Sequence, residues 1–139
     1  MDQQRPDTLR DLLMSSARAL RRRWFVALEP WQLSPHEYRA LHVIDRDTDR
    51  HPRLGDVAKA LRIAPRSATE VVDRLEERGL TERVPDAADR RATCVRLTDA
   101  GRRIIGELET ARADDAEDFF AALDGHDRAE LRRILDKLR

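Results

Sequence analysis

Residues 54–80 read LGDVAKALRIAPRSATEVVDRLEERGL, and this stretch decides the fold. Over residues 54–61 the apolar side chains recur three and four positions apart, which predicts a short amphipathic helix. After a tight turn, Pro65 falls at the first position of a second predicted helix, 65–78, where proline's fixed φ suits the helix. Gly79 follows at a position where glycine commonly ends helices. Two helices joined by so short a turn are typical of a helix-turn-helix.

A β-hairpin is predicted directly after this pair of helices. Residues 81–84 read as a short strand that Pro85 closes, and residues 92–97 alternate well enough for a return strand. The tip between them, residues 86–91, is polar. A helix-turn-helix followed by a hairpin has the parts of a winged helix-turn-helix.

Two further helices are predicted on the N-terminal side. Residues 8–28 carry an apolar stripe at helical spacing, which Glu29-Pro30 ends because proline disfavours helix at the residue before it. Residues 31–33 form a connector, and Ser34-Pro35-His36-Glu37 is a capping box that starts the next helix. That helix ends in the polar run of residues 45–52.

On the C-terminal side, a long helix is predicted over about 98–122, a break at Asp124-Gly125, and a last helix over about 127–138. The expected fold class is mainly α with a small β-hairpin (α+β). The outer helices are too amphipathic to stand alone in water, so a partner chain is expected to cover them. The expected parts are an N-terminal dimerisation helix (1–33), a winged lobe (34–101) and C-terminal dimerisation helices (102–139).

The composition fits a helical protein with a modest core. Of the 139 residues, 40% are apolar and 39% are charged, so a core is possible despite the high charge. The formal net charge is zero, but residues 53–103 carry 12 basic and 9 acidic side chains, whereas residues 104–139 carry 6 and 10. This asymmetry is more informative than the total.

Several classes of protein are disfavoured. The single cysteine, Cys94, excludes an internal disulfide and is more easily explained as a packing residue than as a redox sensor. Residues 1–7 are followed by no apolar run, which predicts no signal peptide, and no apolar stretch approaches a membrane span. We therefore expect a cytoplasmic protein.

Catalytic, cofactor and metal sites are also not expected. The sequence has no Gly-rich phosphate loop, no Gly-x-Ser-x-Gly and no His-Glu-x-x-His. His36 and Glu37 are adjacent, but the long helix predicted over 98–122 has no histidine that would complete a zinc site.

Two stretches resemble the MarR family, the multiple-antibiotic-resistance type of bacterial transcription regulator. Residues 71–83, VVDRLEERGLTER, resemble the end of the family's recognition helix and its first wing strand. Asp89-Arg90-Arg91, followed by VRLTDAG at residues 95–101, resembles the family's wing motif, Asp-x-Arg and then Leu-Thr-x-x-Gly. The resemblance implies a homodimer whose two winged lobes reach successive major grooves of a pseudo-palindromic DNA operator. It also implies a small aromatic or lipophilic effector that binds between the dimer helices and the lobe.

The second helix of the helix-turn-helix offers candidates for reading bases. Arg66, Ser67, Thr69 and Glu70 make its first turns polar, as entry into a major groove requires. Arg66 is the candidate for a bidentate contact with guanine. Glu70 would accept a hydrogen bond from a cytosine amine, or hold Arg66 or Arg74 in place.

The hairpin tip carries Arg90 and Arg91, and a narrow minor groove attracts arginine. In the family the second arginine often braces the wing, which implies that Arg91 pairs with Asp89 and that Arg90 is the candidate for the groove. The candidates for phosphate contacts, which fix register without reading sequence, are Arg53, Lys59 and Arg74. The alternative for all of these side chains is a solvated surface.

The candidate effector site consists of polar-tipped rings: Trp24, Trp31, Tyr38 and His42. Tyr38 and His42 are four residues apart and share a helix face. The resemblance implies that this region borders the effector pocket. The alternative is that Trp24 belongs to the dimer core and that His42 is a packing residue.

We therefore expect a homodimeric, DNA-binding transcription regulator, a repressor that a ligand releases. The alternative is a winged-helix module for protein interaction, which leaves Arg66, Arg90 and Arg91 without a groove to enter. The sequence determines neither the operator, the effector, the regulated genes nor the direction of regulation.

Overall fold

The structure is a computed structural model that describes residues 7–46 and 50–139. The expectation about a signal peptide rests largely on residues 1–6, which lie outside the described residues. Part of the predicted polar run, residues 47–49, lies outside them as well.

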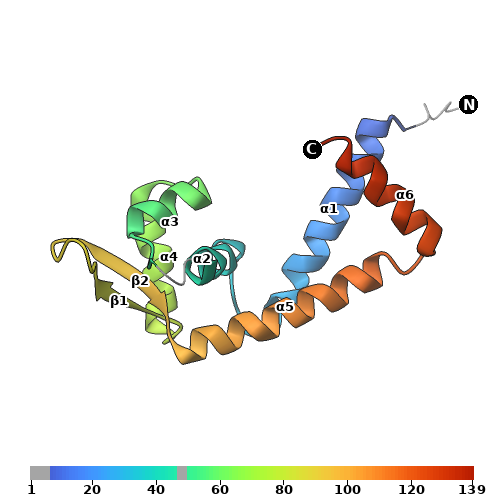
Figure 1. The fold of residues 1–139 in the computed structure, drawn as a ribbon. Coiled ribbons are helices and arrows are strands. Elements are labelled where there is room, and N and C mark those ends of the chain that lie inside the picture. Colours follow the sequence, from blue (N-terminus) through green and yellow to red (C-terminus); the bar gives the residue numbers. More distant parts are fainter. Residues whose placement is uncertain (1–6, 47–49) are drawn as a thin grey trace, which may run out of the picture. The chain divides into compact units, whose positions relative to one another are not determined.

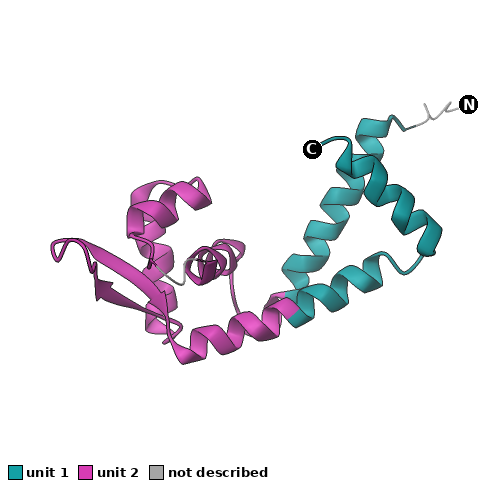
Figure 2. Ribbon diagram, in the orientation of Figure 1, with its two compact units in different colours: residues 1–27, 110–139 teal, residues 28–109 magenta. Residues whose placement is uncertain are grey.

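The chain forms two compact units (Figure 2). The winged unit is residues 28–109, and the outer unit combines residues 1–27 with residues 110–139. Each unit is described by itself.

The described part of the winged unit has the expected mainly helical fold with a small hairpin (Figure 1). One difference is at the end of the first predicted helix, where a 3₁₀ turn forms around Pro30 and runs into the first residue of the predicted connector, since proline is tolerated in a first helical turn. The elements in chain order are η1 (Glu29–Trp31), α2 (Pro35–Arg46), α3 (Leu54–Leu61), α4 (Pro65–Glu77), β1 (Thr81–Pro85), β2 (Thr93–Leu97) and the start of α5 (Asp99–Phe119).

Both ends of α4 form as the sequence predicts. Pro65 is its first residue, and Gly79 lies just beyond its end with a φ of 70°. The Gly79 N–H donates to the Glu76 carbonyl at 2.9 Å, and the Leu80 N–H donates to the Leu75 carbonyl at 3.0 Å. This pair of bonds is a Schellman motif, which satisfies carbonyls that the helix end would leave unpaired.

The hairpin is antiparallel, and its second strand is also bridged to the segment before α3. Thr81 lies opposite Leu97 in the β1–β2 ladder. A single bridge between Arg53 and Cys94 joins the segment before α3 to β2. Burial raises the pKa of the Cys94 thiol, so the thiol stays protonated near neutral pH, as suits a packing residue.

Arg83 of β1 fixes the hairpin to α4. Its Nη2 lies 2.6 Å from Asp73 Oδ1, and its Nη1 donates to Glu76. The hydrogen bond to Asp73 raises the pKa of Arg83. The hairpin and α4 are therefore held together by charge-assisted bonds.

The outer unit contains α1 (Leu9–Ala27), the end of α5 and α6 (Gly125–Asp136). No side chain of α1 or α6 is buried. Large apolar side chains on both helices and just beyond α6 are exposed, and Leu9 on α1 and Leu138 after α6 are the most exposed of them. Within the described residues, these apolar side chains are therefore left open to solvent.

The predicted ends of α5 and α6 need correction. Helix α5 ends at Phe119, about three residues early, and α6 begins at Gly125, two residues early. Asp124 caps α6, because its carboxylate accepts the Asp127 N–H at 2.8 Å and its own N–H donates to Asp127 at 3.3 Å. Gly125 therefore starts a helix after an aspartate cap rather than only breaking one.

Gly101, near the start of α5, tests the packing of the hairpin. A Cβ added at Gly101 would lie 2.1 Å from the Leu80 carbonyl oxygen, which also accepts the Thr98 N–H at 3.1 Å. We expect Gly101→Ala to lower the free energy of unfolding by about 1–3 kcal/mol, because backbone must shift. Urea unfolding followed by circular dichroism measures this.

Gly106→Ala is the matched control on the same helix, where an added Cβ meets nothing within 4 Å. Alanine should stabilise that position by about 0.5–1 kcal/mol. Equal effects of the two substitutions would contradict the close approach at Gly101.

Candidate nucleic-acid interface

The first turns of α4 present a polar, exposed surface. Its apolar side chains, Ala68, Val71, Val72 and Leu75, are buried against the rest of the winged unit. On the outer side, the Arg66 side chain is 93% exposed and lies 3.9 Å from Glu70, one turn later. Ser67 is exposed, and the Thr69 hydroxyl donates to the Pro65 carbonyl at 3.1 Å. The four predicted base-reading side chains therefore start from one short, solvent-facing segment.

Glu70 lies one helical turn after Arg66 on the exposed side of α4. Its carboxylate faces Arg66 at a distance typical of a loose i,i+4 ion pair. Because both side chains are largely exposed, this pair is weak and leaves Arg66 able to reorient.

Arg74, further along α4, is engaged with a buried carboxylate. Its Nε lies 3.5 Å from Glu37 of α2, and Arg78 Nη1 lies 3.8 Å from the same carboxylate. Arg78 also donates to the carbonyls of Trp31 at 2.6 Å and Gln32 at 3.0 Å. Sequence reasoning gave Glu37 only a capping role. The structure adds a long-range ionic role that spacing along the chain does not reveal.

The predicted capping box at the start of α2 is present in part. The Ser34 hydroxyl accepts the Glu37 N–H at 3.1 Å, as expected of an N-cap serine. The Glu37 carboxylate turns toward Arg74 and Arg78 instead. A pair of nearby cations outcompetes a backbone N–H for a carboxylate in a buried place.

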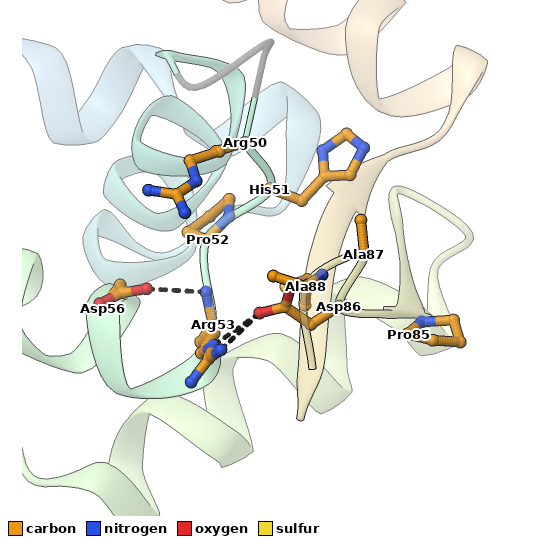
Figure 3. A pocket seen from close by; sticks show the side chains of 10 residues that line it. Arg50, His51, Pro52, Arg53, Asp56, Pro85, Asp86, Ala87 and Ala88 are labelled. Atoms are coloured by element: carbon orange, nitrogen blue, oxygen red, sulfur yellow. Dashed lines mark hydrogen bonds and ion pairs between the residues drawn. The ribbon is translucent and has the colours of Figure 1, made fainter. Parts of the chain in front are cut away.

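Arg53 anchors the wing. Its Nε and Nη2 both lie 2.7 Å from Asp86 Oδ2, and its backbone N–H donates to Asp56 at 3.0 Å (Figure 3). Asp86 also accepts the Ala88 N–H at 2.8 Å. The Ala88 bond and the arginine lower the pKa of Asp86, and Asp86 raises the pKa of Arg53. The predicted phosphate contact Arg53 is thus already paired with a carboxylate of the wing.

A cavity of about 570 Å³ lies beside this ion pair, between residues 50–53 and residues 85–88 (Figure 3). Asp86 follows the proline that closes β1, and the sequence analysis counted it only as part of a polar tip. No spacing rule links it to Arg53, 33 residues away.

The wing tip exposes Arg90 and Arg91. Asp89 accepts the backbone N–H of Arg91 at 3.0 Å, and the Ala92 N–H donates to the Asp89 carbonyl at 2.9 Å. Within residues 7–46 and 50–139, no ion pair joins Arg90 or Arg91 to an acidic side chain. Asp89 therefore shapes the tip through the main chain of Arg91, whereas the resemblance implied a side-chain pair.

The remaining phosphate candidate, Lys59, is exposed on α3. The described residues contain no group of three histidine, cysteine, aspartate or glutamate side chains suited to a metal ion. They also contain no helix that is both long and apolar enough to cross a bilayer.

The predicted effector residues fall in both units. In the winged unit, the Tyr38 hydroxyl lies 2.6 Å from His42 Nε2, which is also 2.6 Å from Glu109 Oε1 of α5. The two rings meet edge to face at 4.6 Å, as their four-residue spacing allows. Trp31 Nε1 donates to Glu107 of α5 at 2.9 Å. Sequence reasoning missed Glu107 and Glu109, which looked like ordinary surface charges. The fourth predicted residue, Trp24 of α1, belongs to the outer unit.

Comparisons with known proteins agree with this architecture. Residues 33–101 match a family model described as a winged helix DNA-binding domain. The chain is similar to the structure of a MarR family protein from Bacillus stearothermophilus, with 27% identity and a TM-score of 0.81. The match covers 94% of this chain and 89% of that one. Its fold is that of the MarR family.

Two further proteins are similar to this chain. Over 85 residues it is 33% identical to the Bacillus subtilis HTH-type transcriptional regulator YsmB, covering 61% of this chain but only 58% of that protein. It also resembles BpsR of Bordetella bronchiseptica, with 25% identity, a TM-score of 0.70 and coverage of 95% and 93%. DNA binding by BpsR is regulated by 6-hydroxynicotinic acid. The matched family model describes a DNA-binding domain rather than an enzyme.

We expect the Arg53–Asp86 contact to make the wing sensitive to acid. Since the pKa of Asp86 is lowered, the ion pair is intact above the usual aspartate pKa of about 4 and is lost as the pH falls through the lowered value. We expect Asp86→Ala to mimic that loss at neutral pH. Amide hydrogen exchange at Ala88 and in β2 should become faster, while exchange in α4 stays slow.

Glu82→Ala is the control for this experiment. Glu82 pairs with Arg96 of the facing strand at 2.6 Å. Its substitution therefore removes a carboxylate from the same hairpin without touching Arg53. Equal acceleration of exchange by both substitutions would show that Asp86 has no special part in fixing the wing.

Proposed function

We propose that this protein is a DNA-binding transcription regulator that works as a homodimeric repressor and is released by a small molecule. The observation that carries the DNA-binding part is the division of α4 into a buried apolar face and an exposed polar face. A helix of this kind can enter a major groove while its scaffold stays packed. Since its target is DNA, we expect the protein in the cytoplasm.

The surroundings of α4 supply contacts that do not depend on base sequence. Arg90 and Arg91 extend from a hairpin that Arg83 fixes to α4, and they suit the minor groove beside a bound recognition helix. Lys59 and Arg74 suit phosphates. For Arg53 we propose a phosphate contact through the N–H groups that Asp86 leaves unused.

The dimer is supported by the outer unit. Six exposed apolar side chains lie on α1 and three on or beside α6: Leu9, Leu12, Leu13, Met14, Phe25, Val26, Ile134, Leu135 and Leu138. Such a density of exposed apolar side chains marks an association surface. A second copy of the chain would cover it symmetrically.

Release by a ligand is supported by the ring contacts. Tyr38, His42 and Trp31 join α2 and η1 to Glu109 and Glu107 of α5. An aromatic molecule with one polar group would stack on a ring and replace one of these hydrogen bonds. To weaken DNA binding tenfold, the ligand needs a coupling free energy of only about 1.4 kcal/mol between its own site and the DNA site.

The decisive experiment is binding to the intergenic DNA upstream of the protein's own gene. We expect one dimer of about 32 kDa, twice the chain mass of 16.1 kDa, on each operator in sedimentation. With roughly six to ten phosphate contacts, affinity should fall by about 10³–10⁵ between 50 and 200 mM salt. Arg66→Ala should cost about 1–3 kcal/mol per contacted base and relax one position in each half-site.

Arg133→Ala is the matched control, because it removes the same charge from α6. A protein that binds no upstream DNA at low salt would favour the protein-interaction module instead. A sequence preference that Arg66→Ala leaves unchanged would move base reading to another residue of α4.

The effector site is tested with Tyr38→Phe, which keeps the buried ring and removes only the hydroxyl. The probe is 6-hydroxynicotinic acid, within a panel of small aromatic acids and phenols. We expect release of wild type from its operator, and an about tenfold higher concentration for the variant, since a hydrogen bond contributes up to about 1.5 kcal/mol. Unchanged release with weaker operator binding would identify the rings as packing residues.

A further inference from the structure

Glu37 occupies an unusual place for a carboxylate. Among the residues that the structure describes, it is the only buried acidic side chain, with 9% of the side chain exposed. Burying a charge is costly unless cations or hydrogen bonds compensate it. Arg74 and Arg78 are the compensating cations, so the three side chains form a cluster with a net charge of +1.

The two arginines of this cluster differ in what else they bind. Arg78, at the end of α4, is fixed by the carbonyls of Trp31 and Gln32. Arg74 is half exposed, and its Nε lies 3.5 Å from the Glu37 carboxylate. Nε is the inner nitrogen of the guanidinium, and the two terminal nitrogens carry the donors that suit a phosphate.

We propose that Glu37 is a positioning residue that holds Arg74 ready to bind a DNA phosphate beside the recognition helix. The inference rests on the proposed DNA-binding function and adds a residue that touches no DNA itself. The carboxylate takes the inner edge of the guanidinium, and a phosphate takes the outer edge. Arg78 keeps the carboxylate in place by tying it to η1 and to the end of α4.

The benefit of this arrangement is entropic. Immobilising one long side chain on binding lowers affinity by a factor of about 2 to 12, and a side chain that is already held avoids much of that loss. A dimer has two such arginines. The negative charge of Glu37 opposes the phosphate, but Arg78 neutralises it within the protein.

The test is a double-mutant cycle in operator affinity. Glu37→Gln keeps the size of the side chain and removes the charge. We expect it to weaken binding by about 5- to 150-fold per dimer when Arg74 is present. In an Arg74→Gln protein the same change should cause no weakening, because the side chain that Glu37 positions is gone.

Glu130→Gln on α6 is the control for net charge, because Glu130 is also paired with an arginine, Arg133, at 2.8 Å. It should leave operator affinity unchanged. Failure of the wild type to bind its operator would refute the proposed function itself. With a wild type that binds, Glu37→Gln binding as tightly as wild type overturns the inference. Equal weakening with and without Arg74 overturns it too.

A second variant covers the case in which Glu37→Gln does not fold, as judged by its thermal unfolding. Arg74→Lys changes only an exposed position of α4 and keeps its positive charge. A lysine cannot bind a carboxylate with one edge and a phosphate with the other. We expect a loss in the same range as for Glu37→Gln. A lysine variant that binds as tightly as wild type would overturn the inference.

Discussion

The burial of one face of α4 is the constraint on which the rest of the winged unit depends. Val71, Val72 and Leu75 are at most 2% exposed, and α4 packs against α2, α3 and β1. Because an α-helix turns once in 3.6 residues, burying this face also determines where Arg66 and Glu70 project. The surface that we propose for reading DNA is thus set by apolar packing on the opposite side of the same helix.

Charge pairs then fix the parts that apolar packing leaves loose. Arg83 attaches β1 to α4, and Arg53 attaches the wing to the start of α3 through Asp86. Glu37 attaches α2 to two arginines of α4. Each of these contacts uses part of a guanidinium, whose five donors allow one arginine to serve structure on one side and a ligand on another. A protein with so few aromatic residues and so many arginines can be braced in this way.

A different set of contacts ties the winged lobe to α5. The hydroxyl of Tyr38 and the carboxylate of Glu109 meet at one nitrogen of His42, and Trp31 binds Glu107. Trp31 also lends its carbonyl to Arg78, at the end of α4. Trp31, a proposed effector residue, and the end of the proposed recognition helix are therefore neighbours within the winged unit. A ligand at the rings acts on DNA binding only if it favours one arrangement of these neighbours over another.

Local physical chemistry made much of this protein readable from its sequence. Pro65 and Gly79 determined the ends of α4, and the 3.6-residue period of Val71, Val72 and Leu75 determined its inner face. The strand alternation and polar tip located the hairpin. These features depend on residues within a few positions of one another, so the sequence displays them directly. The wing motif also indicated a resemblance to the MarR family, because the residues of the motif occur together at the family's spacing.

The tertiary structure alone decided which charges are paired and where. Arg53 and Asp86 are 33 residues apart, and Glu37 and Arg74 come from different helices, so no local spacing links them. Gly125 and Asp124 were misread because a glycine after an aspartate serves equally as a break or as a capped start, and the capping bond decides. With 25 arginines competing for 27 acidic side chains, many pairings are possible in the sequence. Folding selects among them, because apolar packing brings only a few within reach of one another.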